Sequence, residues 1–227
     1  MHASPVKEYA ITHGLPVFQP EKIRTEEALA EFRSHSACVA VVVAYGRILP
    51  KSWLTAFELG AINVHFSLLP KYRGAAPVNW AIINGERETG VTTMRMDEGL
   101  DTGDILVQRS TDIGENENAI ELMDRLAEMG AQLLFSTLAH LPTIKPKPQD
   151  HAAATLAPIL KKDDGRIDFS MTAADVNNRV RGFQPFPTAF TYIGGKRLTI
   201  WRSSVAVPDE LPQAVNEGTI VSAKGDE

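Results

Sequence analysis

An unbroken run of apolar, mostly β-branched residues, CVAVVVA, occupies Cys38–Ala44 and limits most strongly how this chain can fold. Such a run is typical of a strand that is buried on both faces of a parallel sheet. An amphipathic helical pattern with a capping Thr25 precedes it over Thr25–His35, and another helical segment follows it. A second apolar strand then begins at Ala61. This alternation of helix and strand predicts a wound α/β domain.

The end of the second strand carries the clearest candidate site. Asn63 and His65 are two residues apart, so they lie on the same side of an extended backbone. Loops with Gly and Pro follow, and a further turn, Asp97–Asp104, is crowded with Asp and Gly. Polar side chains at a strand end that faces such loops are typical of sites at the carboxyl edge of an α/β sheet.

The remaining patterns divide the chain into two regions. They predict strands at Gly90–Met96 and Asp104–Ile113, a long helix at Glu117–Leu141, a short helix at Ala173–Arg181, a hairpin with strands Ala189–Ile193 and Arg197–Ile200, and a last strand at Gly218–Val221. We therefore expect an α/β domain at 1–141, a Pro- and Lys-rich linker at 142–156 and a β-rich domain at 157–227. Two parallel strands before the site are too few for a stable sheet.

Composition narrows the class of protein further. An apolar content of 44% in 227 residues is ample for a core, and the single cysteine, Cys38, rules out a disulfide framework within the chain. A reducing cytoplasm is therefore the expected location. No apolar run approaches the ~20 residues of a membrane span. No membrane association is expected.

The charge is unevenly distributed along the chain. The net charge is −5, which argues against a generic nucleic-acid coat protein. Residues 1–140 hold 12 Lys and Arg against 18 Asp and Glu, whereas residues 141–206 hold 10 against 5. The second segment could face phosphates, or it could be a solvated surface with a chance surplus of lysines.

Asn63, His65 and Asp101 form a plausible catalytic triad. The amide donates hydrogen bonds, the imidazole can move a proton near neutral pH, and the carboxylate can orient and charge the imidazole. No Ser or Cys occupies a nucleophile elbow. The residues therefore indicate polarisation of a carbonyl for attack by an external nucleophile.

Each of these residues also has a structural interpretation. An Asn or His at a strand end is more often structural than catalytic, and Asp97 in particular could simply stabilise a turn through its backbone bonds. A metal site is not expected, because His65 has no His or Cys partner at ligand spacing.

Several strings resemble the formyltetrahydrofolate-dependent formyltransferases. NVHFSLLPKYRGAAP from Asn63 to Pro77 and DEGLDTGD at Asp97–Asp104 carry the site motifs. Three other stretches match the branch of the family that acts on methionyl-tRNA, and they are SPVKEYAITHGLPVFQPEKIR at Ser4–Arg24, VVVAYGRILP at Val41–Pro50, and LKKDDGRIDFS through RGFQPFPTAFTYIGGKRLTIW within Leu160–Trp201. The resemblance extends over nearly the whole chain.

The resemblance implies a Rossmann-like formyltransferase domain followed by a barrel-like (OB-like) C-terminal domain that helps to hold tRNA. It makes Asn63, His65 and Asp101 the catalytic residues, with 10-formyltetrahydrofolate as the formyl donor and no metal. The residues that it implies in folate binding lie in three segments, and they are Tyr45, Gly46, Ile48 and Leu49; Ser67, Leu68, Leu69 and Pro70; and Gly99 and Leu100.

The implied reaction is formylation of the α-amino group of methionyl-tRNA for translation initiation by a cytoplasmic monomer. Two alternatives stay open. The acceptor could be a sugar amine or a ribonucleotide, or the chain could be a non-catalytic remnant that binds folate or RNA.

The chain departs from the family pattern at a few positions and at both ends. Phe66 stands where the family often has Gly or Ala, which concerns the shape of the pocket. Gln184-Pro185-Phe186-Pro187 replaces the usual Asn-Pro-Trp-Pro. The opening strands of the first domain and the closing part of the second are expected to be missing. The chain could be a fragment, a mis-called start or a decayed copy.

Overall fold

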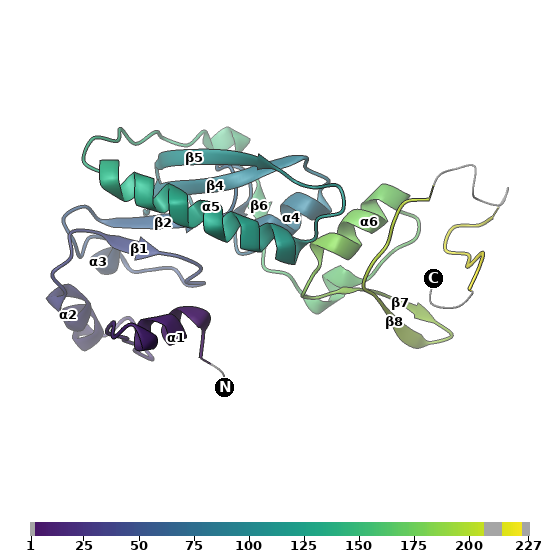
Figure 1. Cartoon of the computed structure of the whole chain (residues 1–227), viewed down its shortest axis with the longest axis horizontal. Helices are drawn as coiled ribbons and strands as arrows, with labels where there is room; N and C mark the ends of the chain where they lie inside the picture. The colour runs from purple at the N-terminus through teal and green to yellow at the C-terminus, as the bar shows by residue number, and fades with distance from the viewer. Residues whose placement is uncertain (1–2, 207–214, 224–227) are drawn as a thin grey trace.

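The computed structural model describes residues 3–206 and 215–223 of the chain. It places a sheet-and-helix region first and a smaller region with one helix and a hairpin after it (Figure 1). The helices are α1 (Pro5–Thr12), α2 (Glu26–Ser34), α3 (Lys51–Leu54), α4 (Pro77–Ile83), α5 (Ala119–His140) and α6 (Ala173–Gly182), with short 3-10 turns at His151–Ala153 and Lys162–Gly165. The strands are β1 (Ala40–Val42), β2 (Ala61–His65), β3 (Arg73–Gly74), β4 (Glu88–Arg95), β5 (Ile105–Asp112), β6 (Leu156–Ala157), β7 (Ala189–Ile193) and β8 (Lys196–Ile200).

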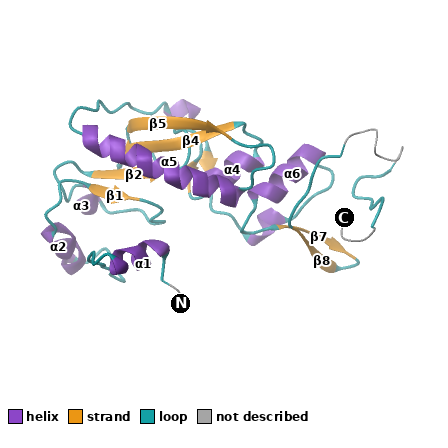
Figure 2. Cartoon of the chain, in the orientation of Figure 1, coloured by secondary structure: helices purple, strands orange, loops and turns teal. Residues whose placement is uncertain are grey.

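The main sheet is mixed, not wholly parallel. Its strand order is β1-β2-β4-β5, as Figure 2 shows with the strands in orange. β1 and β2 are parallel, with Ala40 opposite Ala61, whereas β4 runs antiparallel to both β2 and β5. The α/β class is thus confirmed. A uniformly wound parallel sheet is not what the described residues form.

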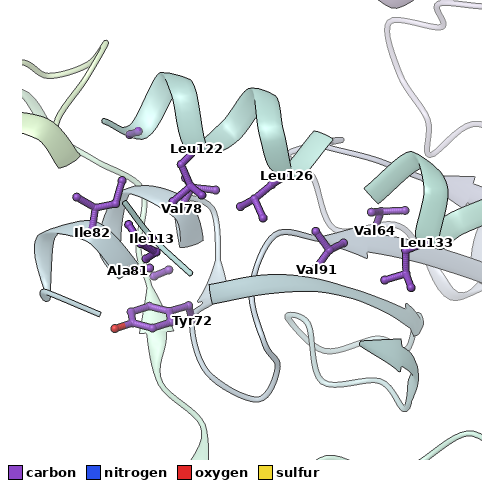
Figure 3. Packing of buried hydrophobic residues seen from close by; sticks show 12 residues of the cluster. Val64, Tyr72, Val78, Ala81, Ile82, Val91, Ile113, Leu122, Leu126 and Leu133 are labelled. Carbon is purple, nitrogen blue, oxygen red and sulfur yellow. The ribbon is translucent and has the colours of Figure 1, made fainter. Parts of the chain in front are cut away.

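Helix α5 covers one face of this sheet. Its start is fixed by a capping box in which the Asn118 side chain accepts from the Glu121 amide and the Glu121 carboxylate accepts from the Asn118 amide. Leu122, Leu126 and Leu133 recur at helical spacing and are at most 3% exposed. They share one core cluster with Val64 and Val91 of the sheet and Val78 of α4, with Leu133 next to Val64 and Leu122 next to Val78 (Figure 3). Full burial of such side chains stabilises a fold by about 1.5–3 kcal/mol each.

The strand predicted at Cys38–Ala44 is shorter and more exposed than expected. β1 spans only Ala40–Val42, and Val41 and Val43 are 41% and 51% exposed. The expectation of burial on both faces is wrong for the described structure. The physical reason is that β1 is the edge strand of the sheet, with β2 as its one neighbour. The nearby helices α1 and α2 bury none of their residues.

Part of the segment predicted as a linker is packed onto the first region. Lys147 and Ile105 exchange both backbone hydrogen bonds at 2.8 Å, and Gln149 is only 5% exposed. Further on, β6 pairs in parallel with β3, with Leu156 opposite Arg73. These residues therefore belong physically to the walls of the candidate site.

The second region contains the predicted helix and hairpin but no closed barrel among its described residues. β7 and β8 pair antiparallel across Gly194-Gly195, and Ile167, Val180 and Ala189 form a small core beneath them. The last predicted strand is wrong, because Gly218–Val221 forms a turn and coil. The partial OB-like barrel is accordingly not confirmed, since among the described residues the two-stranded hairpin gains only a single bridge, from Arg166 to Phe190.

The two regions are joined through α4 and α6. The Asn79 side chain donates to the carbonyl oxygens of Gly182 and Gln184 at 2.8 and 3.3 Å. Arg181 donates to the carbonyls of Gly114 and Glu117 at 3.0 and 2.9 Å. No helix in the described part of the chain is long and apolar enough to cross a membrane.

Candidate active site

Strand β2 presents Asn63 and His65 on the sheet face opposite to α5. The alternation of a strand sends Val64 toward α5, where it joins the core, and sends its two polar neighbours to the other side. His65 is 6% exposed and Asn63 is half-buried. None of the side-chain hydrogen bonds among the described residues involves the Asn63 carboxamide, so its N–H groups can be offered to a ligand.

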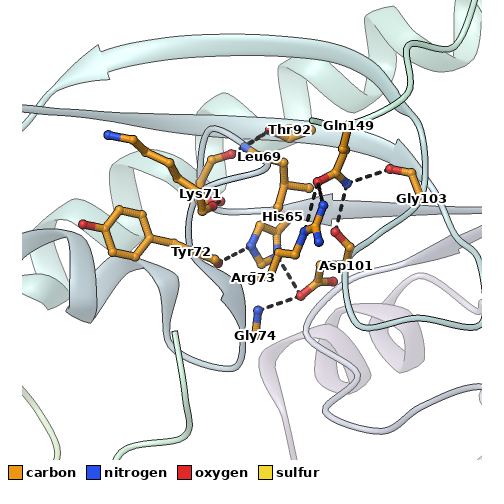
Figure 4. Close-up of polar contacts among 11 residues, drawn as sticks. His65, Leu69, Lys71, Tyr72, Arg73, Gly74, Thr92, Asp101, Gly103 and Gln149 are labelled. Carbon is orange, nitrogen blue, oxygen red and sulfur yellow. Dashed lines mark hydrogen bonds and ion pairs between the residues drawn. The ribbon is translucent and has the colours of Figure 1, made fainter. Parts of the chain in front are cut away.

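The His65 ring is held by a hydrogen bond on one side and faces a carboxylate on the other (Figure 4). Its Nε2 lies 2.9 Å from the Tyr72 carbonyl oxygen. Because a carbonyl can only accept, Nε2 must carry a hydrogen. Nδ1 lies 3.7 Å from Oδ2 of Asp101. That separation is too long for a short hydrogen bond, so Nδ1 faces the carboxylate without being bonded to it.

Asp101 is held in an unusual backbone conformation. Its φ is +52°, a left-handed value that an Asp adopts more readily than most residues but still at some cost. Its Oδ2 accepts a 2.8 Å hydrogen bond from the Gly74 amide in addition to facing His65. The carboxylate is therefore fixed by a backbone donor from β3, an element far from it in sequence.

Asp101 reaches His65 along the face of the sheet rather than from the carboxyl edge. β4 runs antiparallel to β2, with Arg95 opposite Ile62 and Thr92 opposite His65. The loop that follows β4 thus starts beside the beginning of β2. It has to run back along the strand to bring Asp101 to His65 at the far end.

Gly74 can be replaced by no other residue without disturbance. Its φ is +122°, and a Cβ there would lie 2.6 Å from the carbonyl oxygen of Ala157 in β6. The pairing of β3 with β6 therefore requires a glycine. This close approach sets the position of the amide that holds Asp101.

The predicted folate loop, Ser67–Pro70, is tied to β4 and β5. Thr92 Oγ1 donates to the Ser67 carbonyl at 2.6 Å and accepts from the Leu69 amide at 3.2 Å. Gln108 donates to the Leu69 carbonyl at 2.8 Å. The side chains of Ser67 and Leu69 are buried, while Leu68 and Pro70 are half-buried. The loop is thus rigid, and Leu68 and Pro70 keep surface that a ligand could contact.

The other predicted folate residues lie in two exposed segments. Tyr45, Ile48 and Leu100 are exposed, whereas Leu49 is buried in a core cluster with Ile23 and Leu54. Gly46 and Gly99 are exposed backbone positions. The two segments approach each other at the ion pair of Lys51 and Glu98, whose Nζ and Oε2 are 3.6 Å apart.

Asp97, for which a turn-stabilising role is the alternative, does stabilise its turn. Its Oδ1 accepts from the Gly99 amide at 3.0 Å and from the Thr102 hydroxyl at 2.7 Å.

A cavity of about 510 Å³ lies at the start of β2, lined by residues 54–61, Arg95 and Met96. His65 is at the other end of that strand and does not line it.

Sequence reasoning missed Gln149 and Arg73. Both are buried, and Gln149 accepts from Arg73 Nε and Nη2 at 3.1 and 2.7 Å. Arg73 also lies 3.2 Å from the His151 ring. No local motif marks either residue, because their partners are far away in sequence.

Among the described residues no group of three His, Cys, Asp or Glu could hold a metal ion.

The comparisons with known proteins bear on this geometry. A family model described as formyl transferase matches residues 1–138, and one described as formyl transferase, C-terminal domain, matches residues 159–227. This chain belongs to the formyl transferase family. Two curated relatives indicate which members of this family the chain is similar to.

Two curated relatives illustrate how similar this formyl transferase is to named proteins. It is 51% identical to a methionyl-tRNA formyltransferase of Solibacter usitatus over 224 residues, which cover 98% of this chain and 71% of that protein. It is 50% identical to a methionyl-tRNA formyltransferase of Acidobacterium capsulatum over 234 residues, covering 99% of this chain and 74% of that protein.

Solved structures share the fold at lower sequence identity. A sugar N-formyltransferase from Shewanella has a TM-score of 0.70 at 23% identity, covering 88% of this chain and 80% of that one. An N-formyltransferase from Helicobacter canadensis, in complex with folinic acid and dTDP-3-aminofucose, has a TM-score of 0.70 at 24% identity and covers 88% and 70%. At this level of identity the likeness shows the fold alone.

Proposed function

We propose that this formyl transferase moves the formyl group of 10-formyltetrahydrofolate to the α-amino group of methionyl-tRNA, the step that prepares the initiator tRNA for translation. The observation that carries the proposal is identity near 50% to methionyl-tRNA formyltransferases over nearly the whole chain. The arrangement of Asn63, His65 and Asp101 supports it, because it supplies donors without a protein nucleophile.

The catalytic task is to stabilise the formyl oxygen as the amine attacks the formyl carbon. The Asn63 amide donates one hydrogen bond to that oxygen. His65 donates a second one from Nδ1 when the ring is protonated on both nitrogens, because Nε2–H is committed to the Tyr72 carbonyl at 2.9 Å. The Asp101 carboxylate, 3.7 Å from Nδ1, would offset the positive charge of the doubly protonated ring while the oxygen becomes negative.

The bonds and protons balance without any further reactant. The donor supplies the formyl carbon, a C–N bond forms to the methionyl amine, and the bond to the folate nitrogen breaks. The amine loses one proton and the folate nitrogen gains one. Nδ1 of His65 is placed to give its proton to the folate nitrogen and to take the amine's proton in return, directly or through water, so that the ring ends as it began.

The folate segments fit a flat, partly apolar ligand. Tyr45, Ile48 and Leu100 present exposed apolar surface, and the rigid Ser67–Pro70 loop presents Leu68 and Pro70 beside the strand that bears His65. We assign folate binding to these segments. The proposed reaction uses no metal ion.

The second region is assigned to the tRNA. Residues 141–206 hold 10 Lys and Arg against 5 Asp and Glu, and the exposed Tyr192 lies opposite Arg197 in the hairpin. Trp201 is exposed nearby in sequence. Cations with exposed aromatic rings suit phosphates and unpaired bases, so the affinity for tRNA is expected to fall as salt rises. We expect the chain to act as a monomer.

A second acceptor class is considered because the solved structures of similar fold include sugar N-formyltransferases. The purified chain with 10-formyltetrahydrofolate is offered methionyl-tRNA, an amino-sugar nucleotide and glycinamide ribonucleotide in parallel reactions. We expect formylation of methionyl-tRNA. Preferential formylation of either small amine would overturn the acceptor assignment, and folate binding without turnover on any amine would identify a binding remnant.

A further inference from the structure

Gln149 makes four contacts that use its whole amide group. Its Nε2 donates to the carbonyl oxygens of Asp101 and Gly103 at 2.9 and 2.7 Å, and its Oε1 accepts from Arg73 Nε and Nη2. A guanidinium cannot accept and a carbonyl cannot donate, so these partners fix which end of the amide is which. At 5% exposure the side chain is shielded from water.

The loop that carries Asp101 needs an anchor at this point. Its two ends are joined at the sheet, where the Arg95 amide donates to the Asp104 carbonyl at 2.8 Å. Asp101 lies beyond that closure, with φ +52°, and has to stay beside His65. Gln149 holds the main chain on both sides of Thr102, at Asp101 and at Gly103 (Figure 4).

The short run Tyr72-Arg73-Gly74 links this anchor to the catalytic side chains. The Tyr72 carbonyl accepts from His65, the Arg73 side chain holds Gln149, and the Gly74 amide holds the carboxylate of Asp101. One three-residue segment thus fixes the ring directly and fixes the carboxylate through both its side chain and its backbone.

We propose that Gln149 is a positioning residue for catalysis: it holds the Asp101 loop over the sheet so that the carboxylate faces Nδ1 of His65. The inference rests on the proposed function. It goes beyond the triad, because Gln149 lies in the segment that leads from α5 to the second region and touches no reacting atom.

Two substitutions distinguish this positioning role from a purely structural one, in which Gln149 only accepts the hydrogen bonds of the buried Arg73. Gln149→Glu can still accept from Arg73 but cannot donate to the two carbonyls, which it would repel. Gln149→Met keeps the length and loses every hydrogen bond. If Gln149 only satisfied Arg73, the Glu variant would behave like the parent chain. Gln132→Glu, on the exposed face of α5, is the matched control.

We expect both Gln149 variants to lower kcat by about ten- to a hundredfold, with KM for the folate changed less than about threefold, because a misplaced group costs rate more than binding. In an Asp101→Asn background the same substitutions should change kcat by less than about twofold, since Gln149 acts through Asp101. A normal kcat in Gln149→Glu, or an equal loss in the Asp101→Asn background, would overturn the proposal.

Hydrogen exchange separates failure of this inference from failure of the proposed function. The amides of residues 97–104 should exchange faster in Gln149→Glu than in the parent chain, while those of β2 and β4 do not change. If the parent chain transfers formyl to no amine, the proposed function fails and exchange alone decides the positioning role. Unchanged exchange in residues 97–104 would overturn it.

Discussion

Gly130 lies buried on the face of helix α5 that packs on the sheet, and replacing it by Ala tests how tightly this face is packed. A methyl group there would lie 3.1 Å from Val64 Cγ1, 3.2 Å from Phe66 Cε1 and 3.6 Å from Val91 Cγ1. Carbon atoms prefer separations of about 3.5–4.0 Å. Two of the three contacts are therefore too short by a few tenths of an ångström.

Two opposing effects decide the sign of the change. Ala is favoured over Gly inside a helix by about 0.8–1.0 kcal/mol. Extra methyl groups in a packed core cost about 1–3 kcal/mol. Val64 is 7% exposed and cannot move away, whereas Phe66 is half-buried. We therefore expect Gly130→Ala to lower the free energy of unfolding by about 1 kcal/mol, a value near the middle of these ranges.

Urea unfolding of a double-mutant cycle measures the cause. In a Phe66→Ala background the space beside Gly130 opens, and Gly130→Ala should become neutral or stabilising, with a coupling energy of about 0.5–3 kcal/mol. Ser136→Ala, on the exposed side of the same helix, is the control for helix propensity. A gain of about 1 kcal/mol from Gly130→Ala in the parent chain would refute the reasoning.

Two further predictions concern pH. Burial raises the pKa of Tyr72 to about 12, and although the Asn84 hydrogen bond lowers it, the hydrogen bond and charge of Glu86 raise it. The phenol of an unfolded Tyr has a pKa near 10, so the free energy of unfolding should fall as the pH rises from about 10 to 12. It should fall less in Tyr72→Phe, which lacks the phenol. Urea unfolding of both proteins at about pH 9 and about pH 11.5 measures the difference. An equal fall in both proteins would contradict this. Burial raises the pKa of Glu117, but hydrogen bonds from Arg125 and the Gly114 amide and the charges of Arg125 and Arg181 lower it overall. The stability that the charged Glu117 contributes is therefore fully present above the unfolded pKa of about 4.3, and it is lost as the pH falls through the lower pKa of the folded chain. Glu117→Gln should thus lower the free energy of unfolding at about pH 7 and change it little in strong acid. A cost that does not depend on pH would argue against the ion pair.

The sequence predicted most elements because their signals are local. Period-two alternation in Ala61–His65 put Asn63 and His65 on one face, and the helix predicted at Glu117–Leu141 agrees within two residues at each end with α5. The family motifs added Asp101, which the structure brings to 3.7 Å from His65. Phe66 departs from the family pattern at a position that concerns the shape of the pocket. In the structure its side chain packs against the core beneath α5.

The remaining features depend on distant neighbours. The apolar run at β1 predicts a strand, but its burial depends on what flanks it, and β1 is an edge strand in the described sheet. The direction of β4 is not encoded in its own pattern either. Gln149 lies in a Pro- and Lys-rich stretch, and its partners are 46 to 76 residues away. Such a contact is visible only in three dimensions.

Single-turnover formyl transfer to methionyl-tRNA by Asn63→Ala and His65→Ala, measured beside folate affinity, tests the central claim most directly. Each side chain is proposed to act on the formyl oxygen in the transition state. The rate should therefore fall about 10²- to 10³-fold in each variant, with the Kd for the folate changed less than about threefold. Near-normal turnover in either variant that remains folded would contradict the assignment.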